Sequence, residues 1–153
     1  ADHAQRVLGL KVELAVDGEL GEVDDSLVRF LYRSVGGILC NASKHAGVDA
    51  ARLHARRAED RLHVVLADKG AGFDPRKLEA APGVKNGGVG IGLQTIRERL
   101  RVLGGRLVID SRPGRGTTVT LTIPTREPRG ALPDDPDGFA DRLGPGPPSV
   151  ERA

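Results

Sequence analysis

The chain has 153 residues and a net charge of +2, with three Phe, one Tyr and no Trp. Its core must therefore be aliphatic and of the size of one domain. Its single cysteine, Cys40, excludes an internal disulfide framework.

Charge and hydropathy also limit the partners. Arginines alternate with Glu and Asp, and few aromatic side chains could stack on bases, so we expect no nucleic-acid binding. An apolar run of about 18 residues and a signal-peptide layout are both missing from the sequence. We therefore expect a cytoplasmic location and no membrane contact by this domain.

Three segments differ in composition. Residues 1–9 form a short N-terminal remnant or linker, and residues 10–124 form the domain. Residues 125–153 hold six of the ten prolines and show no apolar periodicity. That composition is typical of a disordered tail, rich in Pro and Gly.

The first two elements are a strand and a helix. Alternating apolar residues over 10–16 predict the strand. Asp24, Asp25 or Ser26 can cap the helix, and Gly47 can end it. The helix carries a buried face at helical spacing, made of Leu27, Phe30 or Leu31, Ser34, Val35, Ile38, Leu39, Ala42 and Ala46.

The remaining elements follow a regular order. Residues 51–58 and 61–67 predict a hairpin, and about 25 residues rich in Gly, Pro and Lys then form a long loop. A helix over 93–103 and a second hairpin, 106–110 with 117–123, complete the domain. This order predicts an α/β sandwich with helices on one face of a mixed sheet.

A first polar patch lies near the end of the first helix. Asn41, Lys44 and His45 stand at i, i+3 and i+4 and share one face, and Gly37 falls one turn earlier on it. Lys and His near a helix C-terminus can simply complement the dipole, which leaves Asn41 and the glycine unexplained. From these residues alone, a solvated helix end and a binding site both remain open.

Two more patches are rich in glycine. Asp68 ends an apolar strand and is followed by Gly70 and Gly72, so its carboxylate could accept from the exocyclic amine of a flat ligand. A plain strand-to-loop turn would use the same residues. Gly88, Gly90 and Gly92 run into the second helix, where backbone N–H groups could bind phosphates. They match neither a Rossmann fingerprint nor a Walker A loop.

Taken in order, these motifs resemble the GHKL (Bergerat) ATP-binding fold of two-component sensor histidine kinases. The stretches that carry the likeness are "LYRSVGGILCNASKHAGV", "DKGAGFDP" and "GVGIGLQTIRERLRVLGGRLVIDSRPGRGTTVTLTIP", within about residues 10–124. The resemblance implies a two-layer α/β sandwich with a long, mobile ATP lid over about 75–89.

The resemblance also implies roles for single residues. Asn41 matches the family's ligand for a Mg²⁺ ion that bridges the phosphates of ATP, and Asp68 matches the residue that binds the adenine amine. The full set implied to bind ATP is Asn41, Lys44, His45, Asp68, Gly70, Gly72, Gly88, Gly90, Gly92, Leu93 and Thr117. The implied activity is transfer of the γ-phosphoryl group to a histidine on a dimerisation and phosphoacceptor domain, and indirectly to a response regulator.

One position departs from the family pattern. Gly37 stands where the family usually carries a catalytic Glu, one turn before the motif Asn. In the family that Glu is implied to act as the general base, which contributes roughly 10²–10⁴ in rate. Because this chain has glycine there, we name no catalytic residue. A degenerate kinase that only binds nucleotide and an anti-sigma-type GHKL kinase are therefore kept as alternatives.

Overall fold

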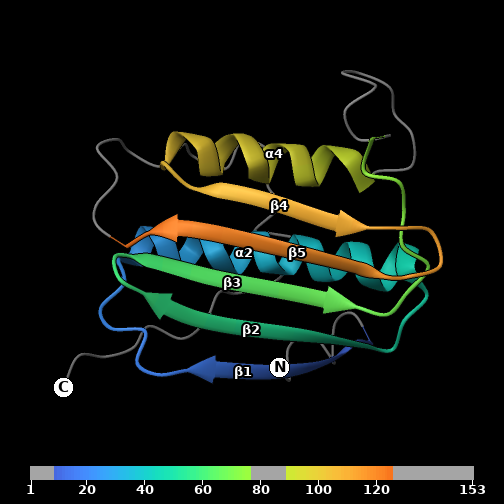
Figure 1. The fold of residues 1–153 in the computed structure, drawn as a ribbon, viewed down its shortest axis with the longest axis horizontal. Helices are drawn as coiled ribbons and strands as arrows, with labels where there is room; N and C mark the ends of the chain where they lie inside the picture. The colour runs from blue at the N-terminus through green and yellow to red at the C-terminus, as the bar shows by residue number, and fades with distance from the viewer. Residues whose placement is uncertain (1–8, 77–88, 126–153) are drawn as a thin grey trace.

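A mixed β-sheet organises the part of the chain that the computed structural model describes, residues 9–76 and 89–125 (Figure 1). Its five strands run in the order β1-β2-β3-β5-β4. They are β1 (Lys11–Asp17), β2 (Ala50–Ala58), β3 (Arg61–Asp68), β4 (Arg106–Ser111) and β5 (Thr117–Pro124). β1 pairs with β2 in parallel, and every other neighbouring pair is antiparallel.

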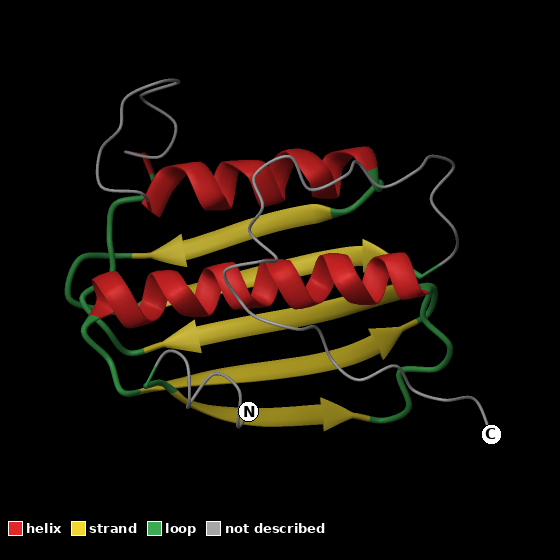
Figure 2. Cartoon of the chain, turned by 180° about the vertical axis from the view of Figure 1, so that it is seen from behind, coloured by secondary structure: helices red, strands yellow, loops and turns green. Residues whose placement is uncertain are grey.

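Two helices cover one face of this sheet, as Figure 2 shows from behind. They are α2 (Asp25–Asn41) and α4 (Val89–Val102). Strand residues alternate between the two faces, so one set from β3 and β5 is buried beneath the helices. This set is Leu62, Val64, Leu66, Val119, Leu121 and Ile123. The predicted element order and the two-layer α/β sandwich are confirmed.

The start of α2 is fixed by a side-chain cap. The Asp24 carboxylate accepts from the Ser26 backbone N–H at 2.7 Å and also binds the Ser26 hydroxyl. Because an N-cap oxygen satisfies an otherwise unpaired N–H of the first turn, Asp24 sets the helix boundary. Asp24 is thus the N-cap among the three candidates named from the sequence.

The end of this helix differs from the prediction. The sequence predicted one α-helix up to Gly47, but residues Ala42–Ala46 form a π-helical turn, η1. The regular α-helical spacing expected across Asn41, Lys44 and His45 was therefore wrong, because a π-turn bonds residue i to i+5 and shifts the later side chains. Gly47 does end the helical segment, at a left-handed φ of 62°.

Helix α4 begins earlier than predicted and ends one residue before the predicted end. It starts at Val89 instead of residue 93, so Gly90 and Gly92 lie inside its first turns. At its end Gly105 N–H bonds to Leu100 O at 2.7 Å and Gly104 N–H to Arg101 O at 3.0 Å, a Schellman pattern. The predicted apolar face is buried, namely Leu93, Ile96, Leu100 and Leu103.

Some predictions fall on residues that the structure does not describe. The tail lies outside the described residues except for Thr125, and most of the predicted ATP lid lies outside them too. Among the residues described, none of the helices is both long and apolar enough to cross a bilayer. The segment boundaries at residues 9 and 124 stay predictions.

Candidate functional site

Several of the predicted site residues meet at one end of the sandwich, on the right in Figure 1. Strand β3 and helix α2 end there, and strand β5 and helix α4 begin there. This arrangement brings Asp68, Thr117, Asn41 and Gly92 to the same end of the fold, although they are far apart in sequence.

Asp68 and Thr117 are direct neighbours across β3 and β5. Directly opposed residues of an antiparallel pair point to the same face, with Cβ atoms about 4.5–5.5 Å apart. One carboxylate oxygen of Asp68, Oδ1, accepts the Gly70 N–H at 2.9 Å and so holds the following turn. Both residues are half-buried and lie at the rim of the core, where β3 ends and β5 begins.

Two glycines let the segment after Asp68 pack against the β4–β5 turn. Gly72 has a φ of 61°, and a Cβ there would come within 2.1 Å of the Arg112 carbonyl oxygen. Gly116 has a φ of 76°, and its Cβ would come within 2.2 Å of the Asp68 carbonyl oxygen. Both positions therefore require glycine for conformation and for space.

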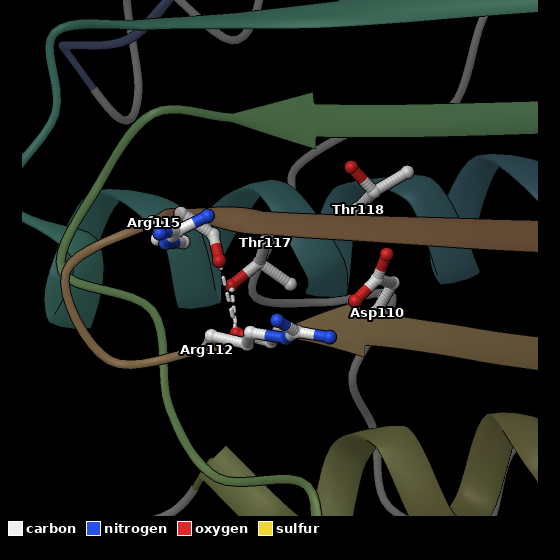
Figure 3. A pocket seen from close by; sticks show the side chains of 7 residues that line it. Asp110, Arg112, Arg115, Thr117 and Thr118 are labelled. Atoms are coloured by element: carbon white, nitrogen blue, oxygen red, sulfur yellow. Dashed lines mark hydrogen bonds between the residues drawn. The ribbon is translucent and has the colours of Figure 1, made fainter.

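Hydrogen bonds join the same two segments. Gly114 N–H donates to Ala71 O at 2.6 Å, and Phe73 N–H donates to Ser111 Oγ at 2.9 Å. Ser111 is 5% exposed and also contacts Gly116 O at 3.0 Å and Thr117 Oγ1 at 2.9 Å. The dashed lines in Figure 3 mark the bonds from Ser111 to Gly116 and Thr117. This network fixes the Thr117 hydroxyl relative to the backbone after Asp68.

Asn41 lies opposite the first turns of α4. A Cβ placed on Gly92 would be 3.9 Å from the amide nitrogen of Asn41, so the bare glycine leaves space beside this side chain. Asn41 is half-buried and is the last residue of α2. The N-terminal turn of a helix presents free N–H groups, so α4 offers donors near the Asn41 side chain.

The other predicted residues are placed differently. Lys44 lies in η1 with an exposed side chain, and His45 lies in η1 but its side chain is outside the described part. Leu93 is 3% exposed and belongs to the core. Gly88 lies outside the described residues, while Gly37 lies in α2 one turn before Asn41.

A polar hollow of about 250 Å³ lies at the β4–β5 hairpin (Figure 3). Its lining consists of Asp110, Ser111, Arg112, Arg115, Gly116, Thr117 and Thr118. Thr118 and Asp110 are cross-strand partners, each next in sequence to a residue of the Thr117 and Ser111 pair. Because neighbouring residues of a strand point to opposite faces, Thr118 and Asp110 face the side of the sheet away from the helices. The hollow thus shares the Ser111 and Thr117 network with the site but opens on the other face of the sheet.

Two pKa shifts are clear among the described residues, one at the start of α2 and the other in the loop that follows β3. The hydrogen bond from the Ser26 hydroxyl, followed by that from its backbone N–H, lowers the pKa of Asp24 below its usual 3.8. Asp74, which bonds to the Arg76 guanidinium at 2.8 Å, raises the pKa of Arg76 above its ordinary value. Neither group takes part in the site.

Ser111 and Gly116 are site residues that the sequence reasoning missed. The signal available was the stretch "SRPGRG", in which a small polar residue and two glycines flank the turn between two strands. That pattern predicted a hairpin turn, but it could not reveal which loop the turn would pack against. The register of β3 on β5 decides this contact.

Comparison with known proteins gives a consistent family. Residues 27–127 match the family model of histidine kinase-, DNA gyrase B-, and HSP90-like ATPases. An uncharacterized sensor-like histidine kinase of Chloroflexus aurantiacus is 38% identical over 104 residues, which cover 67% of this chain and 16% of that protein. The oxygen sensor histidine kinase NreB of Staphylococcus carnosus is 31% identical over 120 residues, which cover 76% of this chain and 31% of that protein.

Solved structures agree on the fold. The histidine kinase domain of the blue-light activated histidine kinase from Erythrobacter litoralis EL346 superposes with a TM-score of 0.59 at 20% identity, over 81% of this chain and 57% of that one. The Acinetobacter baumannii histidine kinase AdeS superposes with a TM-score of 0.62 at 15% identity, over 82% of this chain and 59% of that one. The chain therefore spans less than a third of the two sequence relatives and somewhat more than half of the two solved chains.

Proposed function

Because the chain belongs to the family of histidine kinase-, DNA gyrase B-, and HSP90-like ATPases, we propose that it binds Mg-ATP as the catalytic domain of a two-component sensor histidine kinase. The bound nucleotide would lie at the end of the sandwich where β3 ends and α4 begins. The observation that carries the proposal is the side-by-side placement of Asp68 and Thr117 beside a glycine-permitted backbone contact.

The adenine would bind at Asp68. Oδ1 of Asp68 already accepts the Gly70 N–H, which leaves Oδ2 of Asp68 to accept from the exocyclic amine of adenine. Gly70 and Gly72 lack side chains, so the backbone after Asp68 can approach a flat base closely. A carboxylate at a half-buried rim also discriminates against bases that present a carbonyl oxygen there.

The phosphates would bind between Asn41 and the start of α4. Free N–H groups of the first turn favour anions, and the missing side chain at Gly92 leaves room beside the Asn41 amide. Lys44 is exposed in η1 and can add positive charge. His45 is included as a predicted contact on the same segment.

The residues present fit a Mg²⁺ ion that arrives with its nucleotide. The described residues contain no cluster of three or more His, Cys, Asp or Glu side chains that could hold a metal by themselves. An amide oxygen from Asn41 is a hard, neutral ligand, which suits an ion whose other ligands are phosphate oxygens and water. Such an ion supplies charge neutralisation on the transferring phosphoryl group.

Phosphotransfer would pass the γ-phosphoryl group to an imidazole nitrogen of a histidine on the dimerisation and phosphoacceptor domain, leaving ADP. A response regulator would then receive the phosphoryl group. Gly37 supports a second candidate function, a nucleotide-binding module that does not transfer phosphate, because glycine has no group to accept a proton. The two functions share the same ATP site and differ only in chemistry.

Calorimetry with Mg-ATP tests the binding proposal. We expect saturable binding to the wild-type domain and no measurable binding to Asp68→Asn, whose amide presents a donor to the adenine amine. Asp110→Asn, on the opposite face of the sheet, is the matched control and should bind as wild type does. A well-folded wild-type domain that binds no ATP would refute both candidate functions.

A phosphotransfer assay separates the two. The cognate phosphoacceptor domain is supplied in trans with radiolabelled ATP, and wild type is compared with Gly37→Glu. If Gly37→Glu raises the transfer rate by about 10²-fold or more while ATP affinity is unchanged, the wild type lacks its general base. Rapid transfer by the wild type would instead show that another residue takes this role.

A further inference from the structure

We propose that Ser111 is a positioning residue that makes the Thr117 hydroxyl an obligate hydrogen-bond acceptor, and that it thereby sets the preference of the site for a 6-amino purine over a 6-oxo purine. This inference rests on the proposed function, since it concerns the base end of the same nucleotide site. Ser111 itself would not touch the nucleotide.

The argument begins with the three partners of Ser111 Oγ. Phe73 N–H lies at 2.9 Å and can only donate, so Ser111 accepts from it. Gly116 O lies at 3.0 Å and can only accept, so the single hydroxyl hydrogen of Ser111 is donated there. Thr117 Oγ1, the third partner at 2.9 Å, must therefore donate its own hydrogen to Ser111.

This assignment uses the full hydrogen-bonding capacity of Ser111. A hydroxyl has one hydrogen and two lone pairs, and all three are now engaged. Ser111 is 5% exposed, so water has little access to replace any of these partners. The Thr117 hydrogen is committed to Ser111, and only the lone pairs of Thr117 remain for a ligand.

The neighbour of Thr117 on β3 likewise offers only hydrogen-bond acceptors to a ligand. Asp68 is its direct cross-strand partner, and a carboxylate offers lone pairs only. The rim of the site therefore presents two acceptors side by side, from Asp68 and Thr117. A group with two hydrogens, such as an exocyclic –NH₂ or a bridging water, satisfies both.

A 6-oxo purine would meet the wrong partner at this place. Its carbonyl oxygen brings lone pairs against the lone pairs of Asp68 and Thr117, whereas adenine brings two N–H donors. If Ser111 becomes Ala, the Thr117 hydrogen is released and can rotate toward the ligand. It could then donate to the carbonyl oxygen of hypoxanthine, so the preference for adenine should shrink.

The test is the ratio of the dissociation constants of Mg-ITP and Mg-ATP, measured by calorimetry. We expect wild type to prefer ATP and Ser111→Ala to reduce that preference about five- to tenfold, the effect of one hydrogen bond. Loss of packing alone would weaken both nucleotides equally and leave the ratio unchanged. An unchanged ratio in a folded Ser111→Ala protein that still binds ATP would refute this inference and leave the proposed function intact.

Further variants guard against a folding defect. Thr117→Val leaves both backbone bonds of Ser111 in place and removes the lone pairs, so it should reduce the preference as well. Adding Ser111→Ala to Thr117→Val should then change the ratio no further. Thr117→Ser keeps the hydroxyl, and Thr118→Val alters the opposite face of the strand, so both should retain the wild-type ratio. A preference that survives Thr117→Val would also refute the inference, whereas absent ATP binding by wild type would refute the proposed function first.

Discussion

Gly116 and Asp68 are in such close contact that a Cβ on Gly116 would lie 2.2 Å from the Asp68 carbonyl oxygen. The turn between β4 and β5 therefore packs against the end of β3. Asp68, the residue that we assign to adenine binding, is the last residue of that strand. This contact makes the position of Asp68 depend on a residue that lies 48 positions later in the chain.

Gly116→Ala should therefore damage both stability and nucleotide binding. The added methyl group would clash with backbone and force alanine into a left-handed φ of 76°, a combined cost of about 3 kcal/mol or more. Urea denaturation should show the lower free energy of unfolding, and calorimetry should show weakened ATP binding.

Gly114→Ala is the matched control for this prediction. Gly114 has nearly the same φ, 77°, but a Cβ there would meet no atom within 4 Å. We expect it to cost about 1 kcal/mol from backbone strain alone and to leave ATP affinity unchanged. Equal effects of the two variants would show that the contact with Asp68 has no importance of its own.

Regular spacing is what made the elements of this fold predictable. The apolar positions of α4 recur every three or four residues, and all four predicted ones are buried. The start of α4 was missed because Gly90 and Gly92 are poor helix formers, and local propensity therefore favoured a loop. Packing of α4 beside α2 is a tertiary effect that single-residue propensities do not contain.

The site was predictable only in part, for a similar reason. Asp68 and Thr117 are visible as motif residues, and strand pairing brings them together. Ser111 was missed because its bond to Phe73 joins residues 38 positions apart. Which loop meets which turn depends on the register of the whole sheet, and the sequence pattern of one hairpin does not specify it.

Gly92→Ala should separate stability from function. Its Cβ would meet the Asn41 amide at 3.9 Å, an ordinary contact, so the helix accepts it. Replacing a helical glycine by alanine should raise the free energy of unfolding by about 0.5–1 kcal/mol. The methyl group would occupy space beside Asn41 that we assign to the phosphates, and ATP affinity should fall.

Denaturation and calorimetry on the same samples check this trade-off. Glu98→Ala, an exposed change farther along α4, is the control for binding and should leave ATP affinity unchanged. A Gly92→Ala protein that is more stable and binds ATP as tightly as wild type would place the phosphates elsewhere.

The cap at Asp24 predicts a specific dependence on pH. The folded state lowers the pKa of this carboxyl below 3.8, so it contributes stability above pH 3.8 and loses it as the pH falls through the lowered pKa. Asp24→Ala should lower the melting temperature by a few degrees near neutral pH, and the difference from wild type should shrink in acid.

Asp24→Asn is the informative partner in that experiment. Asparagine is a comparable N-cap but does not titrate, so melting temperatures near neutral pH should stay close to those of wild type. Its melting temperature should also lack the acid-dependent loss that this one carboxyl contributes. A constant difference between wild type and Asp24→Ala at every pH would contradict the role of the ionised cap.

The last prediction concerns the metal ligand. If Asn41 donates its amide oxygen to a nucleotide-bound Mg²⁺ ion, Asn41→Ala should weaken binding of Mg-ATP about tenfold, equivalent to about 1.4 kcal/mol. The same variant should hardly change binding of ATP measured in the presence of a chelator.

Lys44→Ala provides the contrast, because an exposed ammonium group acts on phosphate charge with or without the metal. Its effect should appear in both conditions and should decline as salt is added, whereas the Asn41→Ala effect should follow Mg²⁺. If Asn41→Ala weakens ATP equally with and without Mg²⁺, the amide binds the nucleotide itself and is not a metal ligand.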